Sequence, residues 1–486
     1  MPAQPVSHTE YERAKPYVED VSLEEVIIAI SGLKNWKAPG TDDIPAELIK
    51  YGGKELHVVI HRLCQLIWME ERVPGSWNEA IIIPLHKKGD KTKCDNYRGI
   101  SLLNSAYKVF SRILLDRIVP YAEDSLGEYQ CGFRKGRLTT EQLSIIGQII
   151  EKRYEYRQNM WQLFIDFKKA YDSIHRESLY NIMYEFGFPK KLIALTKMCM
   201  ENTKYREPLQ WNALSPVLFN LALEKVVRIL QESEGGLSIG QNKIRLLGFA
   251  DDLDIIGESL ADTANAARVL EQAAKKIGLE INTKKTKIIE LIDSGEDPNE
   301  TENLAYEKVS DFKYLGATLS TKNDWSREIS MRINKAQKTF YAMTKFFTSR
   351  MLSRKTKVRL YVAIIRPTLT YGCETWTTTK QVEKNLRTFE HRVWRKIYGP
   401  VFDETMENWR RRYNRELYDM LDLAPLTSFI KSQRIQWLGH IMRRRENEVV
   451  RGALEWKPQG KRPRGRPRKR WIDVVEEDLK ILGGEV

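Results

Sequence analysis

Two adjacent aspartates, Asp251 and Asp252, constrain this chain most, because they lie between two short apolar runs. The runs cover residues 244–249 and 253–256, are rich in Ile and Leu, and are interrupted by charges. This pattern predicts a β-hairpin with the acid pair at its tight turn. The two like charges repel each other, and a divalent cation would neutralise them because Mg²⁺ prefers oxygen ligands. Since Asp also caps its own backbone in ordinary turns, the pair alone leaves both interpretations open.

A third carboxylate lies at the end of another predicted strand. Residues 161–165 alternate in hydrophobicity as a strand does, and the strand ends at Asp166. One strand-end aspartate and a hairpin pair are what two-metal phosphoryl or nucleotidyl transfer requires, because the carboxylates bridge both ions and fix their spacing. The three acids together are therefore more specific than either half, and they predict a site for two Mg²⁺ ions.

Five motifs follow one another along the chain. They are NYRGISLL (96–103), QCGFRKGR (130–137), FIDFKKAYD (164–172), ALSP (213–216) and FADD (249–252). In this order they resemble the motifs of the reverse transcriptase of non-LTR (LINE-like) retrotransposons, with similarity from about residue 37 to residue 379. The resemblance implies an RNA-directed DNA polymerase that binds an RNA template, a DNA primer or target and dNTPs, and that extends the primer 3′-hydroxyl.

The fold implied by this resemblance is α+β, a right-hand polymerase with fingers, palm and thumb and a basic helical C-terminal extension. We expect an N-terminal extension at 1–80, fingers and palm at 81–290, primer grip and thumb at 291–380, and a basic nucleic-acid-binding region at 381–486. Apolar periodicity agrees with this outline. It predicts a strand at 80–85 and helices at 102–122, 139–156, 217–230 and 259–277. Ser215 and Pro216 are expected to be the N-cap and first residue of the third helix.

The resemblance also assigns roles at the reaction centre. Asp166, Asp251 and Asp252 would hold the two Mg²⁺ ions, and Phe167 would add a backbone carbonyl. Lys285 matches the position that protonates leaving pyrophosphate, although an exposed lysine is an equally good reading of the sequence. Tyr171 matches the aromatic residue that excludes a ribose 2′-hydroxyl, with a core tyrosine as the alternative.

Further basic and aromatic positions match the parts of the family that hold substrate and nucleic acid. By resemblance, Lys87, Lys88 and Arg98 hold the incoming triphosphate, and the arginine fork suits phosphate. By the same comparison, Arg134, Lys135 and Arg137 grip template phosphates. A solvated basic loop is the plain alternative for both groups. Tyr314 lies in a segment that resembles the strand turn gripping the primer end.

The match breaks just before residue 213. The family carries a strand pair and then Arg-Gln-Gly-Asp before ALSP, whereas this chain reads KYREPLQWNA over 204–213. Only Gln210, a substrate-binding candidate, is kept, and Trp211 stands where glycine is expected. Because glycine lets backbone approach the nascent base pair, and an error of about 1 Å can cost roughly a hundredfold in rate, activity is in question. The alternative function is a catalytically inactive, retrotransposon-derived nucleic-acid-binding remnant.

Charge and composition indicate a polyanionic partner. The net charge is +14, and residues 431–470 hold fourteen Lys and Arg against three Glu. Residues 461–470 read KRPRGRPRKR, a segment typical of minor-groove insertion, with Arg464 and Arg466 as candidates, or of a nuclear localisation signal. A disordered tail, or a chromatin or import-receptor partner bound through this tail, remains open. We expect a nuclear protein, with a cytoplasmic ribonucleoprotein form possible.

The remaining composition excludes several classes of protein. The five cysteines are scattered, and none forms a Cys-x-x-Cys pair, which argues against a zinc knuckle or a disulfide framework. No apolar run reaches membrane-spanning length, so we expect a soluble intracellular protein with no membrane partner. We see no endonuclease domain before the polymerase motifs, and therefore do not expect the chain to nick a target by itself. The oligomeric state is left open.

Overall fold

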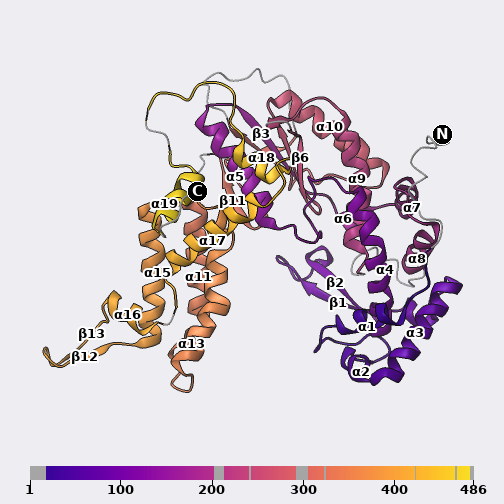
Figure 1. Ribbon diagram of the computed structural model, residues 1–486, viewed down its shortest axis with the longest axis horizontal. Helices are drawn as coiled ribbons and strands as arrows, with labels where there is room; N and C mark the ends of the chain where they lie inside the picture. The colour runs from indigo at the N-terminus through magenta and orange to yellow at the C-terminus, as the bar shows by residue number, and fades with distance from the viewer. Residues whose placement is uncertain are drawn as a thin grey trace.

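The computed structural model describes residues 18–201, 213–239, 242–291, 305–321, 324–421, 423–465 and 468–481. These residues form an arch with a sheet at the top and two limbs below it (Figure 1). The chain mixes helices with several small sheets, which is the α+β class expected, and the names fingers, palm and thumb are kept for the regions in which the sequence places them. Within these ranges, no helix combines the length and the apolar character that crossing a membrane requires.

A five-stranded sheet forms the palm, and β3 is its central strand. Strand β3 pairs antiparallel with β7 on one side and with β8 on the other, while β8 pairs parallel with β9. Strands β6 and β7 are the arms of one antiparallel hairpin. The strands are β3 (Met160–Ile165), β6 (Leu246–Phe249), β7 (Asp252–Gly257), β8 (Lys287–Leu291) and β9 (Glu307–Lys308). The predicted strand before Asp166 and the predicted hairpin are both confirmed.

Helices surround this sheet and build the fingers limb. Strands β1 (Ile81–His86) and β2 (Tyr97–Leu102) form a separate two-stranded sheet, as expected for a strand that carries Pro84. The helices of this half are α1 (Leu23–Ser31), α2 (Ala46–Tyr51), α3 (Gly53–Glu70), α4 (Ser105–Ser125), α5 (Thr139–Glu155), α6 (Ala170–Ser173), α7 (Arg176–Glu185), α8 (Lys190–Glu201), α9 (Ser215–Glu232) and α10 (Leu260–Lys276). Shorter pieces are the 3₁₀ turns η2 (Gly75–Asn78) and η3 (Cys94–Asn96) and the strands β4 (Leu237–Ile239) and β5 (Asn242–Ile244).

Both faces of the palm sheet are buried, because alternate side chains of a strand point to opposite sides. On β3, Trp161, Leu163 and Ile165 join one hydrophobic core, which also contains α7, α9 and α10. The intervening Met160 and Phe164 join a second core, which contains α5 and the thumb. The sheet is therefore packed on both sides, which fixes the end of β3 where the acids lie.

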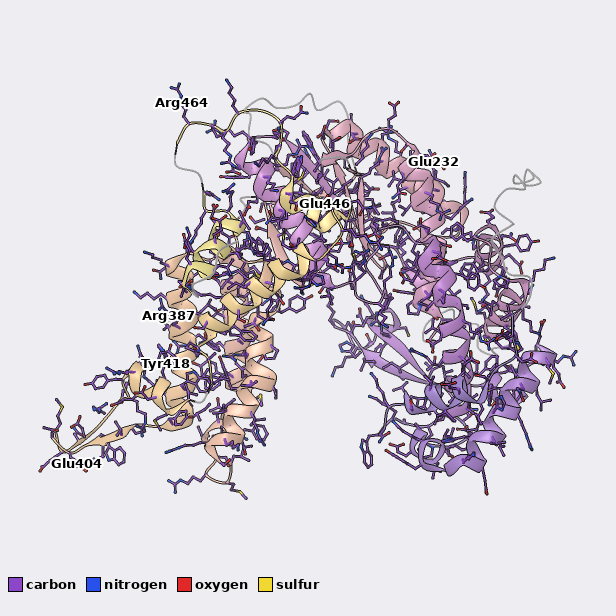
Figure 2. The ribbon with its side chains drawn as sticks, in the orientation of Figure 1. Glu232, Arg387, Glu404, Tyr418, Glu446 and Arg464 are labelled. Carbon is purple, nitrogen blue, oxygen red and sulfur yellow. The ribbon has the colours of Figure 1, made fainter. Side chains whose placement is uncertain are left out.

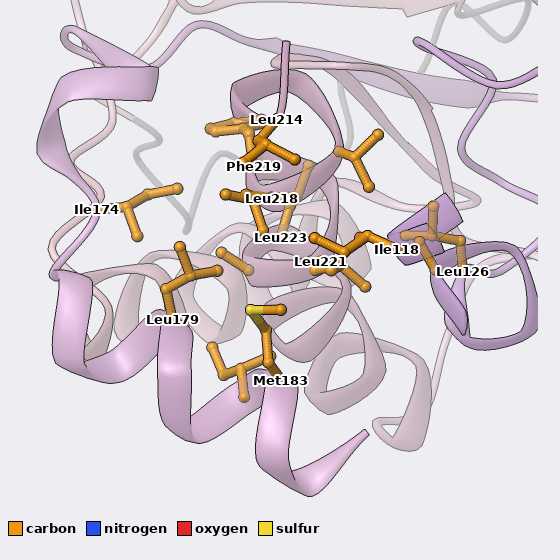
Figure 3. Packing of buried hydrophobic residues seen from close by; sticks show 14 of the residues in the cluster. Ile118, Leu126, Ile174, Leu179, Met183, Leu214, Leu218, Phe219, Leu221 and Leu223 are labelled. Atoms are coloured by element: carbon orange, nitrogen blue, oxygen red, sulfur yellow. The ribbon is translucent and has the colours of Figure 1, made fainter. Parts of the chain in front are cut away.

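Helix α9 fills the first core. It is apolar on most sides, and Figure 3 shows its Leu218 near Leu179 and Met183 of α7. The predicted helix is confirmed, but its N-cap is Leu214 rather than Ser215, which is the first helical residue. A shift of one residue is within the usual ambiguity of a helix end.

The thumb limb consists of one long helix, several short helical pieces and a two-stranded sheet. Its elements are β10 (Asp311–Tyr314), β11 (Ala317–Ser320), α11 (Ser326–Ala342), α12 (Thr344–Thr348), α13 (Arg354–Leu360), the π-helical turn η4 (Tyr361–Ile365), α14 (Arg366–Thr370) and the 3₁₀ turn η5 (Cys373–Thr375). The C-terminal region continues with α15 (Lys380–Tyr398), β12 (Val401–Asp403), β13 (Asn408–Arg410), α16 (Asn414–Met420), α17 (Leu426–Met442), α18 (Val449–Glu455) and α19 (Trp471–Ile481). It is mostly helical, as expected, but the β12–β13 hairpin has no counterpart among the predictions.

The C-terminal region folds back onto the palm. The Nζ atom of Lys152 on α5 donates to the carbonyls of Ala453, Leu454 and Trp456 at 2.5 to 2.7 Å, which satisfies the end of α18. The backbone amide of Trp471 donates to Glu151, also on α5, at 2.8 Å. The second core therefore runs from α5 through the thumb to α19 and does not stop at the predicted boundary after residue 380.

A further aspartate of the hairpin lies inside the protein. Asp254 is 0% exposed, and one of its carboxylate oxygens accepts a hydrogen bond from Gln162 at 3.2 Å. Burial holds the pKa of this carboxyl well above its usual range. Asp254 therefore lies apart from the three predicted acids, although the sequence places it only two residues from Asp252.

Replacing Asp254 with asparagine is expected to change how stability depends on pH. Because the pKa of Asp254 is raised in the folded protein, folding favours the protonated carboxyl. Its contribution to folding stability is therefore complete below the unfolded pKa of about 3.9. It is lost as pH rises above that value, so the Asp254→Asn variant should gain stability relative to the wild type between pH 5 and pH 8. Thermal unfolding at several pH values, with Asp124→Asn as an exposed control, measures this. A stability difference that does not change with pH would contradict the assignment.

Candidate active site

The three predicted acids converge at one end of the palm sheet. The pair Ile165 and Leu253 is in register between β3 and β7, so Asp166 follows β3 directly beside the hairpin. Phe249 pairs with Asp252, which leaves a two-residue turn that contains Asp251. The requirement that Asp166 share a sheet with the acid pair is therefore met.

Burial and a neighbouring negative charge raise the pKa values of Asp251 and Asp252. Burial is the largest cause at Asp251, and the charge of Asp166 adds to it, while Arg98 and Lys285 oppose the shift. Asp252 is exposed as a residue, but protein surrounds much of its carboxylate. This burial, followed by the negative charges of Asp251 and Asp166, raises the pKa of Asp252 to about 6. A cluster of acids with raised pKa values is a region of excess negative potential, which a cation would relieve.

A turn before β8 is bonded to Asp166 and brings a lysine to it. The backbone amide of Asn282 donates to the Asp166 carbonyl at 2.7 Å, and the Asp166 amide donates to Oγ1 of Thr286 at 3.3 Å. From this turn, Lys285 Nζ reaches Oδ2 of Asp166 at 3.0 Å, with its own side chain 67% exposed. The predicted proton donor thus lies at the acid cluster, with most of its side chain in solvent.

Phe167 and Tyr171 lie next to the acids. Phe167 is buried and faces Ile281 in an isolated antiparallel bridge. The hydrogen bonds of this bridge are made by the neighbouring residues Asp166 and Lys168. The backbone carbonyl of Phe167 therefore takes no part in the bridge. The half-buried ring of Tyr171 packs on Phe219 at 4.7 Å between centroids. Burial, together with the charges of Asp251 and Asp252, raises the pKa of the Tyr171 hydroxyl.

A buried glutamine holds the turn that carries Asp251, and the sequence did not predict this role. Ala250 has φ +59°, a left-handed conformation that costs energy in a residue other than glycine. Gln130, 0% exposed, accepts hydrogen bonds from the amides of Ala250 (2.7 Å) and Gly132 (2.8 Å) and donates to the Ala250 carbonyl (3.2 Å). A Cβ on Gly132 would come within 2.1 Å of the Ala250 nitrogen. The motif QCGF therefore supports the hairpin. A polar residue next to a glycine-containing turn in a recognised motif was the sequence signal that could have pointed to this role of Gln130.

The β1–β2 sheet extends from the fingers toward the acids (Figure 1). Arg98, on β2, lies close enough to Asp251 and Tyr171 that its positive charge partly offsets the rise in their pKa values caused by burial and by the nearby aspartates. Lys87 and Lys88 are exposed in the turn that follows β1. The structure thus brings Arg98 to the site and leaves the triphosphate role of all three cations as a prediction.

The basic turn after Gln130 uses most of its charge within the protein. Arg134 pairs with Glu123 at 2.8 Å and is 6% exposed, while Arg137 pairs with Glu128 and Glu448. Lys135 is exposed. Template contact therefore stays a prediction, and for Arg134 and Arg137 it would require these ion pairs to open.

One other predicted contact, Tyr314, is buried. Tyr314 is 2% exposed, with its ring 5.3 Å from that of Phe164 in the second core, so its side chain cannot grip a primer. The alternation of β10 turns it inward and leaves Lys313 exposed. Gln210 and the neighbouring Trp211 lie outside the described residues.

The basic tail lies along the end of α5 rather than free of the body. Arg462 pairs with Glu155 at 3.2 Å, and Arg468 stacks over Tyr154 at 4.8 Å. Arg464 is exposed on an extended segment (Figure 2), and Arg466 lies outside the described residues. Minor-groove insertion by these two arginines stays a prediction.

The donor set suits a hard divalent cation, although the carboxylates are not yet arranged as ligands. In the described ranges, no group of three or more His, Cys, Asp or Glu side chains is spaced to hold a metal ion. The Asp166 carboxylate is engaged by Lys285, which a bound cation would displace. Carboxylate oxygens with raised pKa values fit Mg²⁺ chemically, after a rearrangement of side chains.

Comparisons with known proteins agree on the region that contains these residues. Residues 85–319 match a family model described as reverse transcriptase (RNA-dependent DNA polymerase). A transposon-derived protein of Caenorhabditis elegans is 29% identical over 249 residues, which cover 49% of this chain and 88% of the relative. The RNA-directed DNA polymerase from the mobile element jockey of Drosophila melanogaster is 26% identical over 412 residues. That alignment covers 78% of this chain and 44% of the relative, so the chain spans less than half of that polymerase.

Two further matches extend the comparison. The Pol polyprotein from the type-1 retrotransposable element R2 of Popillia japonica is 27% identical over 305 residues, which cover 57% of this chain and 40% of the relative. An apo telomerase structure from Candida tropicalis aligns over 55% of this chain and 60% of that one, with 15% identity and a TM-score of 0.34. A structural likeness of that size carries no argument.

Proposed function

Residues 85–319 are a reverse transcriptase domain related to RNA-directed DNA polymerases of non-LTR retrotransposons, and from this premise we propose that the chain extends a DNA primer on an RNA template. The observation that carries the proposal is the meeting of Asp166 with Asp251 and Asp252 at one end of the palm sheet. Arg98, Tyr171 and Lys285 lie around them. Three acids with cations beside them suit transfer of a nucleotidyl group.

The chain's own residues would position the reactants and manage their charge. Asp166, Asp251 and Asp252 would hold two Mg²⁺ ions, with the Phe167 carbonyl as a further ligand. Such ions, when bound, activate the 3′-hydroxyl and stabilise charge on the triphosphate. Arg98 would hold the triphosphate from the fingers side, because a guanidinium forms paired hydrogen bonds to phosphate oxygens. Lys285, released from Asp166, would give a proton from Nζ to the departing pyrophosphate oxygen.

Tyr171 is expected to set the preference for deoxynucleotides. Its ring packs on Phe219 and its hydroxyl lies near the charges of Asp251 and Asp252, which places the side chain where a sugar would lie. Tyr171→Ala should therefore raise ribonucleotide incorporation relative to deoxynucleotide incorporation by about tenfold or more, because a steric exclusion is removed. Single-nucleotide extension with dNTP and NTP series measures the ratio. Tyr184→Ala on the surface of α7 is the control, and an unchanged ratio in a folded Tyr171→Ala protein would leave Tyr171 as a core residue only.

The direct test of the proposed function is primer extension by the full chain. An RNA template with an annealed DNA primer, dNTPs and Mg²⁺ should yield extended primer, and chelation of the metal should stop it. Binding of the primer–template without any extension would instead identify the chain as the nucleic-acid-binding remnant that Trp211 and the altered segment before residue 213 suggest.

We further propose that the protein works in the nucleus, since its substrates would include chromosomal DNA. The support is the basic segment 461–470, in which Arg464 is exposed. The contacts of Arg462 and Arg468 with α5 mean that an import receptor would compete with the body of the protein for this segment.

A further inference from the structure

The distal end of the thumb carries a basic pocket that the polymerase reaction does not use. Helix α15 ends at Gly399, whose φ of +73° turns the chain into the β12–β13 hairpin. The chain then returns through Arg411 and Arg412 past the end of the same helix. The resulting cavity of about 440 Å³ is lined by five cations, which are Arg392, Arg395, Lys396, Arg411 and Arg412. We call this cavity the distal pocket.

The charge of the distal pocket is not neutralised within the protein. Among the described residues, none of its five cations forms an ion pair with an acid, whereas the adjacent Arg410 binds both Asp403 and Glu416. Arg412 is close enough to Glu416 for an electrostatic attraction, but the Glu416 carboxylate already forms an ion pair with Arg410. The Nε atom of Arg412 is buried and, in the part of the chain that the structure describes, has no hydrogen-bond partner. Like charges gathered around an open cavity attract an anion.

Geometry within the pocket orients the guanidinium groups. Arg395 donates from Nε to the carbonyl of Arg412 at 3.2 Å and from Nη2 to Oδ1 of Asn414 at 2.5 Å. These bonds tie α15 to the segment that follows the hairpin. The cavity is therefore built from two chain segments held in a fixed relation, rather than from a single flexible basic loop.

Exposed aromatic rings lie beside the distal pocket. Phe402 on β12 and Trp409 on β13 are 47% and 64% exposed, and their rings meet edge to face at 5.5 Å. Tyr413, 62% exposed, follows Arg412 directly. Large apolar side chains that stay exposed on paired positions of a hairpin mark an interaction surface. Figure 2 shows Glu404 at the free end of this hairpin, away from the body of the molecule.

We propose that the distal pocket and the β12–β13 hairpin bind single-stranded nucleic acid outside the polymerase cleft. The cations would bind successive backbone phosphates. Trp409 and Phe402 would stack on bases, which are accessible in a single strand but stacked on one another inside a duplex. In Figure 1 the hairpin points away from the fingers, so its ligand is a strand other than the duplex in the arch. DNA and RNA share this chemistry, and the experiment distinguishes them.

The test is oligonucleotide binding by the full chain with the polymerase cleft filled by saturating unlabelled primer–template. Fluorescence anisotropy of labelled oligo-dT and oligo-U gives the two affinities, and the tighter one identifies the strand. Arg411→Ala with Arg412→Ala should weaken binding about tenfold or more near 0.15 M salt. Loss of two phosphate contacts should also lower the slope of log K against log salt by about 1.4. Trp409→Ala alone should weaken binding about fivefold or more through lost stacking.

The matched control removes two exposed arginines elsewhere, Arg62→Ala with Arg72→Ala on α3 and just after its end, and should bind as the wild type does. Affinities of the pocket variants equal to this control would overturn the proposal. A duplex that binds more tightly than either single strand, or a polyglutamate peptide that competes equally while Trp409→Ala has no effect, would also overturn it. Because the readout is binding, Asp251→Ala should bind as the wild type does, and a chain without polymerase activity could still confirm the site.

Discussion

Replacing Asp251 with alanine is expected to abolish primer extension on an RNA template, a loss of at least about a thousandfold. Asp251 occupies the turn of the β6–β7 hairpin, next to Asp252 and across from Asp166. Without it the acids that we propose as Mg²⁺ ligands lose one of three members. Steady-state extension with saturating dNTPs and Mg²⁺ measures the effect.

The same substitution should not destabilise the fold. Burial and the charge of Asp166 raise the pKa of Asp251, so its carboxylate is electrostatically unfavourable in the folded protein. Thermal unfolding should therefore give a melting temperature equal to or above that of the wild type. Asp124→Ala, which removes an exposed acid near the end of α4, should keep full activity. Measurable extension by a well-folded Asp251→Ala protein would remove the acid from the reaction.

Replacing Gln130 with alanine is expected to lower both stability and turnover. The change leaves the amides of Ala250 and Gly132 buried without their acceptor, which should cost about 2 to 4 kcal/mol of unfolding free energy. It also releases the left-handed conformation of Ala250, so Asp251 moves relative to Asp166. A displacement of about 1 Å corresponds to roughly a hundredfold loss in rate. Because Gln130 does not touch substrate, kcat should fall while KM for dNTP changes little.

A second glutamine provides the control for this prediction. Gln65 on α3 makes one long hydrogen bond to the Val21 carbonyl at 3.5 Å, and Gln65→Ala should change stability by no more than about 0.5 kcal/mol. Activity is compared well below both melting temperatures, so that unfolded protein does not contribute. If folded Gln130→Ala kept the wild-type kcat, Gln130 would support the fold alone and the proposed positioning role would be wrong.

The sequence predicted the elements that depend on local pattern. Alternating apolar residues placed β3 before Asp166, and the two runs around Asp251 placed the hairpin, because a strand with buried faces must repeat every second residue. Periodicity of the helical kind placed α9 and α10 within a few residues. By contrast, the motif that contains Tyr314 gave its position in the chain but not which side of the strand it occupies, and its ring packs near Phe164 in the second core.

The site divides in the same way. Residue type and order were enough to pick out Asp166, Asp251 and Asp252, because two-metal transfer needs carboxylates. Tyr171 and Lys285 were singled out only by the family resemblance. The sequence did not identify Gln130 as the residue that holds the Ala250 turn, because its hydrogen bonds to Ala250 span 120 residues. Nor could the sequence show that Arg134 and Arg137 form ion pairs with acids of the same chain.

The sequence by itself determined the strand before Asp166, the β6–β7 hairpin, the main helices of the palm and the acids of the site. Only the tertiary structure decided that Asp254 is buried against Gln162, and that the basic tail rests on Tyr154 and Glu155. Only the tertiary structure also gathered Arg392 and Arg412 around one cavity. The physical reason is that local pattern records which side chains avoid water. Which of them meet depends on packing between segments that are far apart in the chain.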